Sequence, residues 1–174
     1  MEASGCTYDL EEISLYGANG KPSWFLKLNP SGTVPVITYK DDVVPDSELI
    51  LDYIANGNVE GAAKTLENGA DSVKWRNAIK SQLAPLGKKA VLSGGQFESK
   101  LYDLLKEMDV DVQGPYLCGD AISAADCAAF PFMWRINNEF GLPKECVNLS
   151  AWLQHCSANS AFQKTVQRSW WWWW

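Results

Sequence analysis

The feature that most constrains the fold of this chain is a change in the spacing of its apolar residues around residues 56–68. Before this segment, short apolar runs at residues 7–15 and 34–44 lie between turn signals, which predicts strands. After it, apolar residues recur at helical spacing over residues 75–86 and 97–108, which predicts helices that face a core. The segment itself is rich in Gly, Ala and Asn and is typical of a connector.

These patterns predict an α+β fold in two parts. A small α/β part should cover residues 1–57, a linker residues 58–65 and an all-α part residues 66–168, with a tryptophan-rich tail at residues 169–174. The α/β part is predicted to contain a strand, a short helix after Pro22, a hairpin and a helix capped by Asp46. In the all-α part, Ser123 and Asp126 have the spacing of a capping box, so we predict that their role is structural.

Composition narrows the possible partners. The 174 residues are 47% hydrophobic and 21% charged, which allows an ordinary core and argues against a disordered chain. A formal charge of -6 argues against nucleic acid as a partner. No apolar run reaches the roughly 18 residues of a transmembrane helix, and the acidic start differs from a secretory leader. The five cysteines lack metal-ligand spacing, so we expect no metal and a reducing compartment, either the cytosol or an organelle interior such as a plastid.

Two blocks of sequence resemble the glutathione transferase superfamily. The first is NPSGTVPVI at residues 29–37 with PDS at 45–47, and the second is GPYLCGD at 114–120 with SAAD at 123–126. The resemblance covers residues 7–168 and implies a partial thioredoxin-like domain followed by the all-helical domain of this superfamily. The segment KPSWFLK and the Asp-Ser pair are most similar to the dehydroascorbate reductase branch and its chloride-intracellular-channel relatives.

The resemblance implies a glutathione site. Pro35 is similar to the family's cis-proline, which turns the Val34 backbone N–H and C=O outward to pair with an extended peptide. The start of a helix at Asp46 and Ser47 offers N–H groups, a hydroxyl and a positive dipole end to the γ-glutamyl carboxylate, and Asp46 can meet the ammonium. Lys21 would lie near the glycyl carboxylate or the sulfur, with Trp24 beside the cleft. The residues alone leave a second interpretation open, in which Val-Pro starts an edge strand and Asp-Ser caps a helix.

No catalytic residue is predicted. In the family, the thiol-activating residue lies in a first strand and helix, for which the residues upstream of Thr7 give no counterpart. Cys6 is followed by acidic residues, which disfavour a thiolate, and His155 has no acid, cysteine or serine partner by spacing. Three explanations stay open: a longer natural chain, a domain completed by another polypeptide, or a distorted remnant of the domain.

The tail carries five consecutive tryptophans, whose indoles together present more apolar surface than a monomer normally exposes. A partner protein is the preferred cover, and the alternatives are a groove of the same domain, the interfacial zone of a membrane, flat ligands or a sequencing artefact. The predicted partner-binding residues are Trp170, Trp171, Trp172, Trp173 and Trp174.

Taken together, these features predict a glutathione-transferase-like protein that acts as a non-catalytic binding or scaffold subunit. Its partners would be protein subunits of a larger, membrane-associated and photosynthetic assembly, with peripheral membrane contact through the tail. The alternative is an active glutathione-dependent transferase or dehydroascorbate reductase. A third interpretation is a carrier that holds glutathione or a hydrophobic ligand between the two parts.

Overall fold

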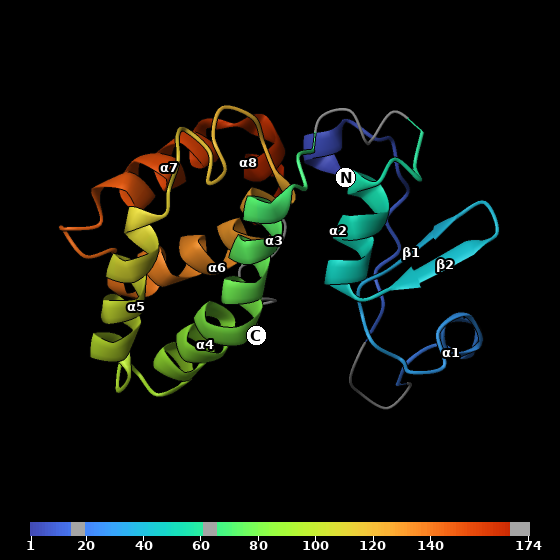
Figure 1. Cartoon of the computed structure of the whole chain (residues 1–174). Helices are drawn as coiled ribbons and strands as arrows, with labels where there is room; N and C mark the ends of the chain where they lie inside the picture. The colour runs from blue at the N-terminus through green and yellow to red at the C-terminus, as the bar shows by residue number, and fades with distance from the viewer. Residues whose placement is uncertain (15–19, 61–65, 168–174) are drawn as a thin grey trace.

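The computed structural model describes residues 1–14, 20–60 and 66–167. It has two parts that lie side by side, a small one made of a hairpin with short helices around it, and a larger one made of helices (Figure 1). The small part contains η1 (Glu2–Ser4), α1 (Ser23–Leu28), β1 (Val36–Tyr39), β2 (Asp42–Pro45) and α2 (Ser47–Ala55). The helical part contains α3 (Ala70–Ala78), the π-helical turn η3 (Ile79–Leu83), α4 (Ala84–Leu92), α5 (Glu98–Val110), α6 (Ala124–Phe140), α7 (Val147–Ala158) and α8 (Ser160–Gln167).

The short helix α1, the hairpin and the helix after it follow one another in the order predicted for them. β1 and β2 pair antiparallel, with Val36 opposite Pro45 and Tyr39 opposite Asp42. Lys40 closes the turn at a φ of 55°. The apolar face of α2 buries Ile50 and Ile54 in a small core that also takes Val59, Leu66 and Ala124. Because Ala124 belongs to α6, this core joins the two parts.

The strand predicted at residues 7–15 is wrong for the residues that the structure describes there, which are 7–14 and form no strand. A strand persists because its backbone groups pair with a neighbouring strand. In the described ranges the sheet has only two strands, β1 and β2, and neither lies against this segment. Leu10, which alternation would place on a buried face, is 58% exposed.

The helical part confirms the predicted helical spacing. Trp75, Ile79 and Leu83 lie in the main core, and α5 contributes Leu101, Leu104, Leu105 and Met108 to it. Across this core, α6 supplies Phe130, Met133 and Ile136, which are almost fully buried. Among the described helices, none is long and apolar enough to cross a membrane. The predicted partner-binding tryptophans lie outside the described residues, as does most of the predicted linker, so both stay predictions.

The capping box at the start of α6 is confirmed and extends into a buried network. The Ser123 N–H donates to Asp126 at 2.7 Å, and the Asp126 N–H donates to the Ser123 hydroxyl at 3.4 Å. The Asp126 carboxylate also accepts from the Leu117 N–H at 2.8 Å and from the Trp152 indole at 2.7 Å. The carboxylate therefore ties together α6, α7 and the loop before α6.

Gly114 lies in that loop where no larger residue fits. A Cβ at this position would lie 2.9 Å from the Gly119 carbonyl oxygen, and backbone bonds between Tyr116 and Gly119 hold that oxygen in place. We expect Gly114→Ala to lower the free energy of unfolding by about 1–3 kcal/mol, the usual cost of overpacking. Urea denaturation tests this. The control is Gly69→Ser, which adds a Cβ where no described atom lies within 4 Å. An unchanged stability of Gly114→Ala would contradict the predicted clash.

Candidate functional site

The entry to the hairpin and the start of α2 lie next to each other. The Asp46 N–H donates to the Pro35 carbonyl at 3.1 Å, and β1 and β2 begin and end at the paired residues Val36 and Pro45. The Val34–Pro35 peptide bond is cis. Residues that are eleven positions apart in sequence, Pro35 and Asp46, are thus brought together by one hairpin.

Val34 presents a free backbone edge beside this junction. The residue is 37% exposed. Neither its N–H nor its C=O forms a hydrogen bond to any described residue. A peptide in extended conformation can pair with such an edge as an added strand does, through one donor and one acceptor.

The first turn of α2 presents further unpaired polar groups. The Asp46 carboxylate accepts from the Glu48 N–H at 2.9 Å through Oδ1. Within the described ranges, its Oδ2 and the Ser47 N–H and hydroxyl have no hydrogen-bond partner. Both residues are exposed. A helix start with free N–H groups favours an anion, so this turn is suited to a carboxylate.

Lys21 lies across the turn that leads to Val34. Gly32 has a φ of 65°, and a Cβ at this position would lie 3.1 Å from the Lys21 Nζ. The same turn is held by the buried Asn29, whose side-chain amide donates to the Thr33 carbonyl at 2.8 Å. Lys21 therefore places a cation next to the residues that precede Val34. Trp24 is 49% exposed and meets Phe25 edge to face.

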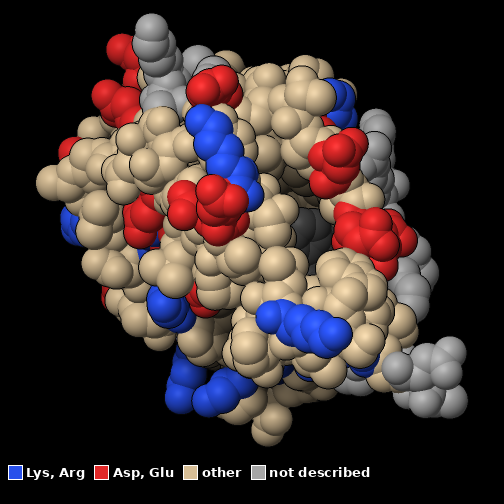
Figure 2. Space-filling model, turned by 90° about the vertical axis from the view of Figure 1, so that its right-hand side faces the viewer, with Lys and Arg blue, Asp and Glu red and all other residues tan. Residues whose placement is uncertain are grey.

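The structure brings Val34, Pro35, Asp46 and Ser47 together and sets Lys21 on the adjoining turn. Figure 2 shows the face of the small part, where acidic side chains gather mostly in the upper half and basic ones mostly in the lower half. The lower half corresponds to the level of α1 and α4 in Figure 1. The two ends of this face therefore differ in charge.

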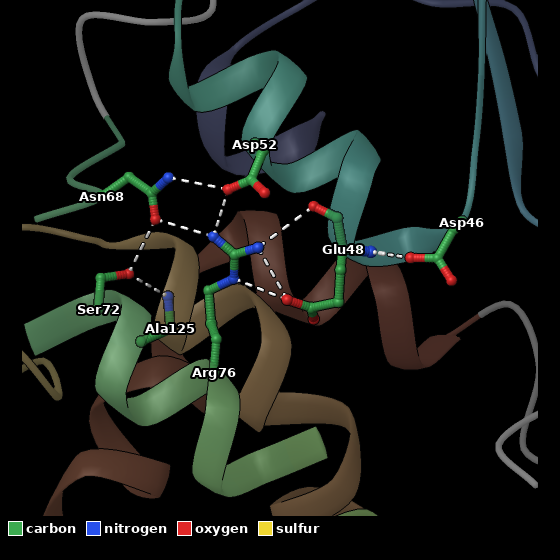
Figure 3. Close-up of polar contacts among 7 residues, drawn as sticks. All are labelled: Asp46, Glu48, Asp52, Asn68, Ser72, Arg76 and Ala125. Carbon is green, nitrogen blue, oxygen red and sulfur yellow. Dashed lines mark hydrogen bonds and ion pairs between the residues drawn. The ribbon is translucent and has the colours of Figure 1, made fainter. Parts of the chain in front are cut away.

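Reasoning from the sequence missed an ion-pair cluster beside the site, in which a buried arginine meets two partly exposed acids. Arg76 of α3 is 6% exposed and contacts Glu48 at 2.8 Å and Asp52 at 2.6 Å, both on α2 (Figure 3). The hydrogen bond from Arg76 lowers the pKa of Asp52 below its ordinary value of 3.8. Burial alone lowers the pKa of Arg76, but the bonds to Asp52 and Glu48 outweigh it and raise that pKa overall. The i, i+4 spacing of Glu48 and Asp52 was a signal for one shared face, although nothing pointed to Arg76.

The two residues weighed as catalytic candidates in the sequence, His155 and Cys6, make contacts typical of structural residues. His155 is exposed and meets the Tyr116 ring edge to face, with 4.9 Å between ring centroids. Cys6 accepts a hydrogen bond from the Ser4 hydroxyl and packs against the small core. In the described part of the chain, no cluster of three or more His, Cys, Asp or Glu residues could hold a metal ion. A groove of about 480 Å³ lies between α4 and α5, and its lining includes none of the residues around Val34.

Two cysteines are expected to resist alkylation. Burial raises the pKa of Cys127 to about 12 and also raises the pKa of Cys156, whose side chain is fully buried. At about pH 8 the Cys127 thiol is therefore almost entirely protonated, and the thiolate is the reactive form. Iodoacetamide followed by peptide mass spectrometry should show both unmodified in the folded protein and modified in urea. Modification of Cys156 at the same rate in both states would contradict the packing around it.

Comparison with known proteins adds an independent line of evidence. Residues 1–56 match the family described as "Glutathione S-transferase, N-terminal domain", and residues 58–155 match "Glutathione S-transferase, C-terminal domain". The chain is 26% identical to "Glutathione S-transferase DHAR3, chloroplastic" of Arabidopsis thaliana, over 95% of this chain and 64% of that protein. It is also 26% identical to "Probable glutathione S-transferase DHAR1, cytosolic" of Oryza sativa subsp. japonica, over 88% of this chain and 75% of that protein.

Solved structures show the same fold. Glutathione transferase Omega 3C from Trametes versicolor matches with a TM-score of 0.79 and 24% identity, over 94% of this chain and 79% of that one. The theta-class glutathione S-transferase from Xanthomonas axonopodis pv. citri, solved with glutathione bound, matches with a TM-score of 0.79 and 21% identity, over 97% and 88%. At these identities the likeness concerns the fold.

Proposed function

Because this chain belongs to the glutathione S-transferase family and resembles its DHAR members, we propose that it binds glutathione and takes part in a glutathione-dependent transferase or reductase reaction. The chain spans 64% and 61% of the lengths of two DHAR relatives. Their activity and substrates, which belong to the longer proteins, are therefore proposals for this chain. Relatives named chloroplastic and cytosolic agree with the reducing compartment that the cysteines favour.

Each part of the tripeptide has a matching group in the site. The cysteinyl residue of glutathione pairs with the free N–H and C=O of Val34. The γ-glutamyl residue carries both a carboxylate and an ammonium. Its carboxylate accepts hydrogen bonds from the Ser47 N–H and hydroxyl at the start of α2, and its ammonium donates to the free Oδ2 of Asp46. The glycyl carboxylate lies toward the Lys21 ammonium. The residues that carry these roles are Lys21, Val34, Pro35, Asp46 and Ser47.

The chemistry of such a protein depends on the thiol of glutathione, which is the nucleophile or the reductant. The residues assigned above bind and orient the tripeptide. Orientation alone lowers a reaction barrier because it converts a bimolecular encounter into a positioned one. We assign no thiol-activating residue among the described side chains.

An enzymatic role is now preferred over the scaffold role that the sequence favoured. The scaffold hypothesis rested on the region upstream of residue 7 and on the tryptophan tail, and neither the described contacts nor the comparisons add an observation for it. The comparisons instead match both domains of a transferase family. The partner-binding role of Trp170–Trp174 and the division at residues 58–65 remain proposals.

The observation that carries the proposed function is the bond between Asp46 and Pro35, which sets the free Val34 edge against the free start of α2. Isothermal titration with glutathione should show saturable binding with a Kd of roughly 1 µM to 1 mM, the range in which KM values of enzymes for their substrates typically lie. Glutathione-dependent formation of ascorbate from dehydroascorbate tests the reaction. Absence of binding at millimolar glutathione would overturn the proposal, and binding without turnover would favour a carrier.

A further inference from the structure

We propose that Arg76, which belongs to the helical part, is a positioning residue for the γ-glutamyl end of glutathione. The inference rests on the proposed glutathione site and adds to it a specificity determinant on α3. Arg76 lies one helix away from the ligand and acts through the first turn of α2. Figure 3 shows its guanidinium between the two acidic side chains of α2.

The guanidinium holds that turn by both its side chain and its backbone. Arg76 Nε donates to the Glu48 carboxylate at 2.9 Å, and Nη2 donates to the Glu48 main-chain carbonyl at 3.2 Å. Nη1 donates to Asp52, one helical turn later, at 2.6 Å. Two successive turns of α2 are thus fixed against one planar group.

Glu48 connects Arg76 to the protein groups that are proposed to bind the ligand. The Glu48 N–H donates to Asp46 Oδ1 at 2.9 Å, and Ser47 lies between the two residues. The hydrogen bond orients the Asp46 carboxylate so that Oδ2 stays available for an ammonium. Because Arg76 fixes the peptide group that follows Glu48, a shift of Arg76 would tilt the turn that carries Asp46 and Ser47.

The other side of Arg76 is anchored in the helical part. Its Nη1 also donates to Asn68 Oδ1 at 2.9 Å, and the Asn68 amide donates to Asp52 at 3.1 Å. The Ser72 hydroxyl donates to the same Asn68 oxygen at 3.4 Å and accepts from the Ala125 N–H at 3.1 Å. This network reaches the first turn of α6, so the orientation of the guanidinium is set by the helical core.

The positive charge of Arg76 also favours binding of the γ-glutamyl carboxylate. Asp46, Glu48 and Asp52 place three carboxylates along the cap and the first two turns of α2, and the substrate carboxylate is proposed to bind at the start of this helix. Arg76 offsets part of this negative charge. Lysine cannot replace it fully, because a single ammonium does not reproduce the fork that reaches a carboxylate, a carbonyl and Asp52 at once.

The test compares glutathione with cysteinylglycine, which lacks the γ-glutamyl group, as competitors for elution from glutathione-agarose. For Arg76→Lys, the apparent affinity for glutathione should fall about tenfold or more, whereas the affinity for cysteinylglycine should stay within about twofold. Glu48→Gln keeps the Arg76 bonds to Asp52 and to the main-chain carbonyl and should give a smaller loss, again for glutathione alone. Circular dichroism melting confirms that each variant is folded.

The matched control is Lys74→Ala on the same helix, which removes an exposed ion pair with Asp111 and should change neither affinity. Equal losses for both competitors in folded Arg76→Lys would overturn the positioning role and leave the proposed function standing. Wild-type protein that binds neither competitor would overturn both. If Arg76→Lys does not fold, Arg76→Gln decides, because it lacks the charge and the fork of the guanidinium, and a wild-type affinity for glutathione in that variant would overturn the inference.

Discussion

Replacing Asp126 with alanine is expected to lower the free energy of unfolding by about 4 kcal/mol or more, the largest loss of stability among the substitutions considered. The carboxylate is fully buried and accepts from Leu117, twice from Ser123 and from Trp152. Each buried donor left without a partner costs about 1–3 kcal/mol, and removal of one member of a buried charged network typically costs 3–5 kcal/mol. Since small domains are stable by only about 5–15 kcal/mol, Asp126→Ala should be largely unfolded in mild urea.

Urea denaturation followed by circular dichroism measures this loss. Ser123→Ala keeps most donors paired and should cost only about 1 kcal/mol, as loss of a helix cap does. The exposed Asp120, six residues earlier, provides the surface control, and Asp120→Ala should change stability by less than about 0.5 kcal/mol. If Asp126→Ala unfolded at the wild-type urea concentration, the network would not be what holds α6 and α7 together.

The largest effect on binding is expected from Asp46→Ala combined with Ser47→Ala. Together they remove a carboxylate and a hydroxyl proposed to contact the γ-glutamyl group, and hydrogen bonds to charged groups contribute about 1.5–3 kcal/mol each. The predicted Kd for glutathione rises at least about 100-fold, and the protein should no longer be retained on glutathione-agarose.

Asp41→Ala is the matched control for the double variant. It removes one exposed acid from the hairpin turn, so it changes the net charge equally and leaves the start of α2 intact. Loss of the Asp46 cap weakens α2 by about 1 kcal/mol, so retention should be compared well below the melting temperature. Retention of the folded double variant at the wild-type level would place the ligand elsewhere.

The features that the sequence predicts well are those encoded by neighbours along the chain. Ser123 and Asp126 form a cap because they are three positions apart, and helical spacing alone places Leu101 and Leu105 in the core. The hairpin follows from two short apolar runs on either side of a turn. The glutathione residues required the resemblance in addition, because an Asp-Ser helix start by itself also fits a simple cap.

What the sequence could not predict depends on contacts between distant segments. The alternation of residues 7–14 suggests a strand, but a strand forms only beside a partner strand, and the described sheet provides none there. Arg76 pairs with acids that lie 24 and 28 positions earlier, so no local spacing reveals it. The Trp152 bond to Asp126 is hidden for the same reason, since the two residues lie on different helices.

Nuclear magnetic resonance titration of the 15N-labelled chain with glutathione tests whether the tripeptide binds between Val34 and the start of α2. We expect the amide signals of Val34 and Ser47 to shift the most and to saturate together, because their N–H groups gain hydrogen bonds to the same tripeptide. Shifts confined to the groove between α4 and α5, or the absence of any saturable shift at millimolar glutathione, would contradict binding at this site.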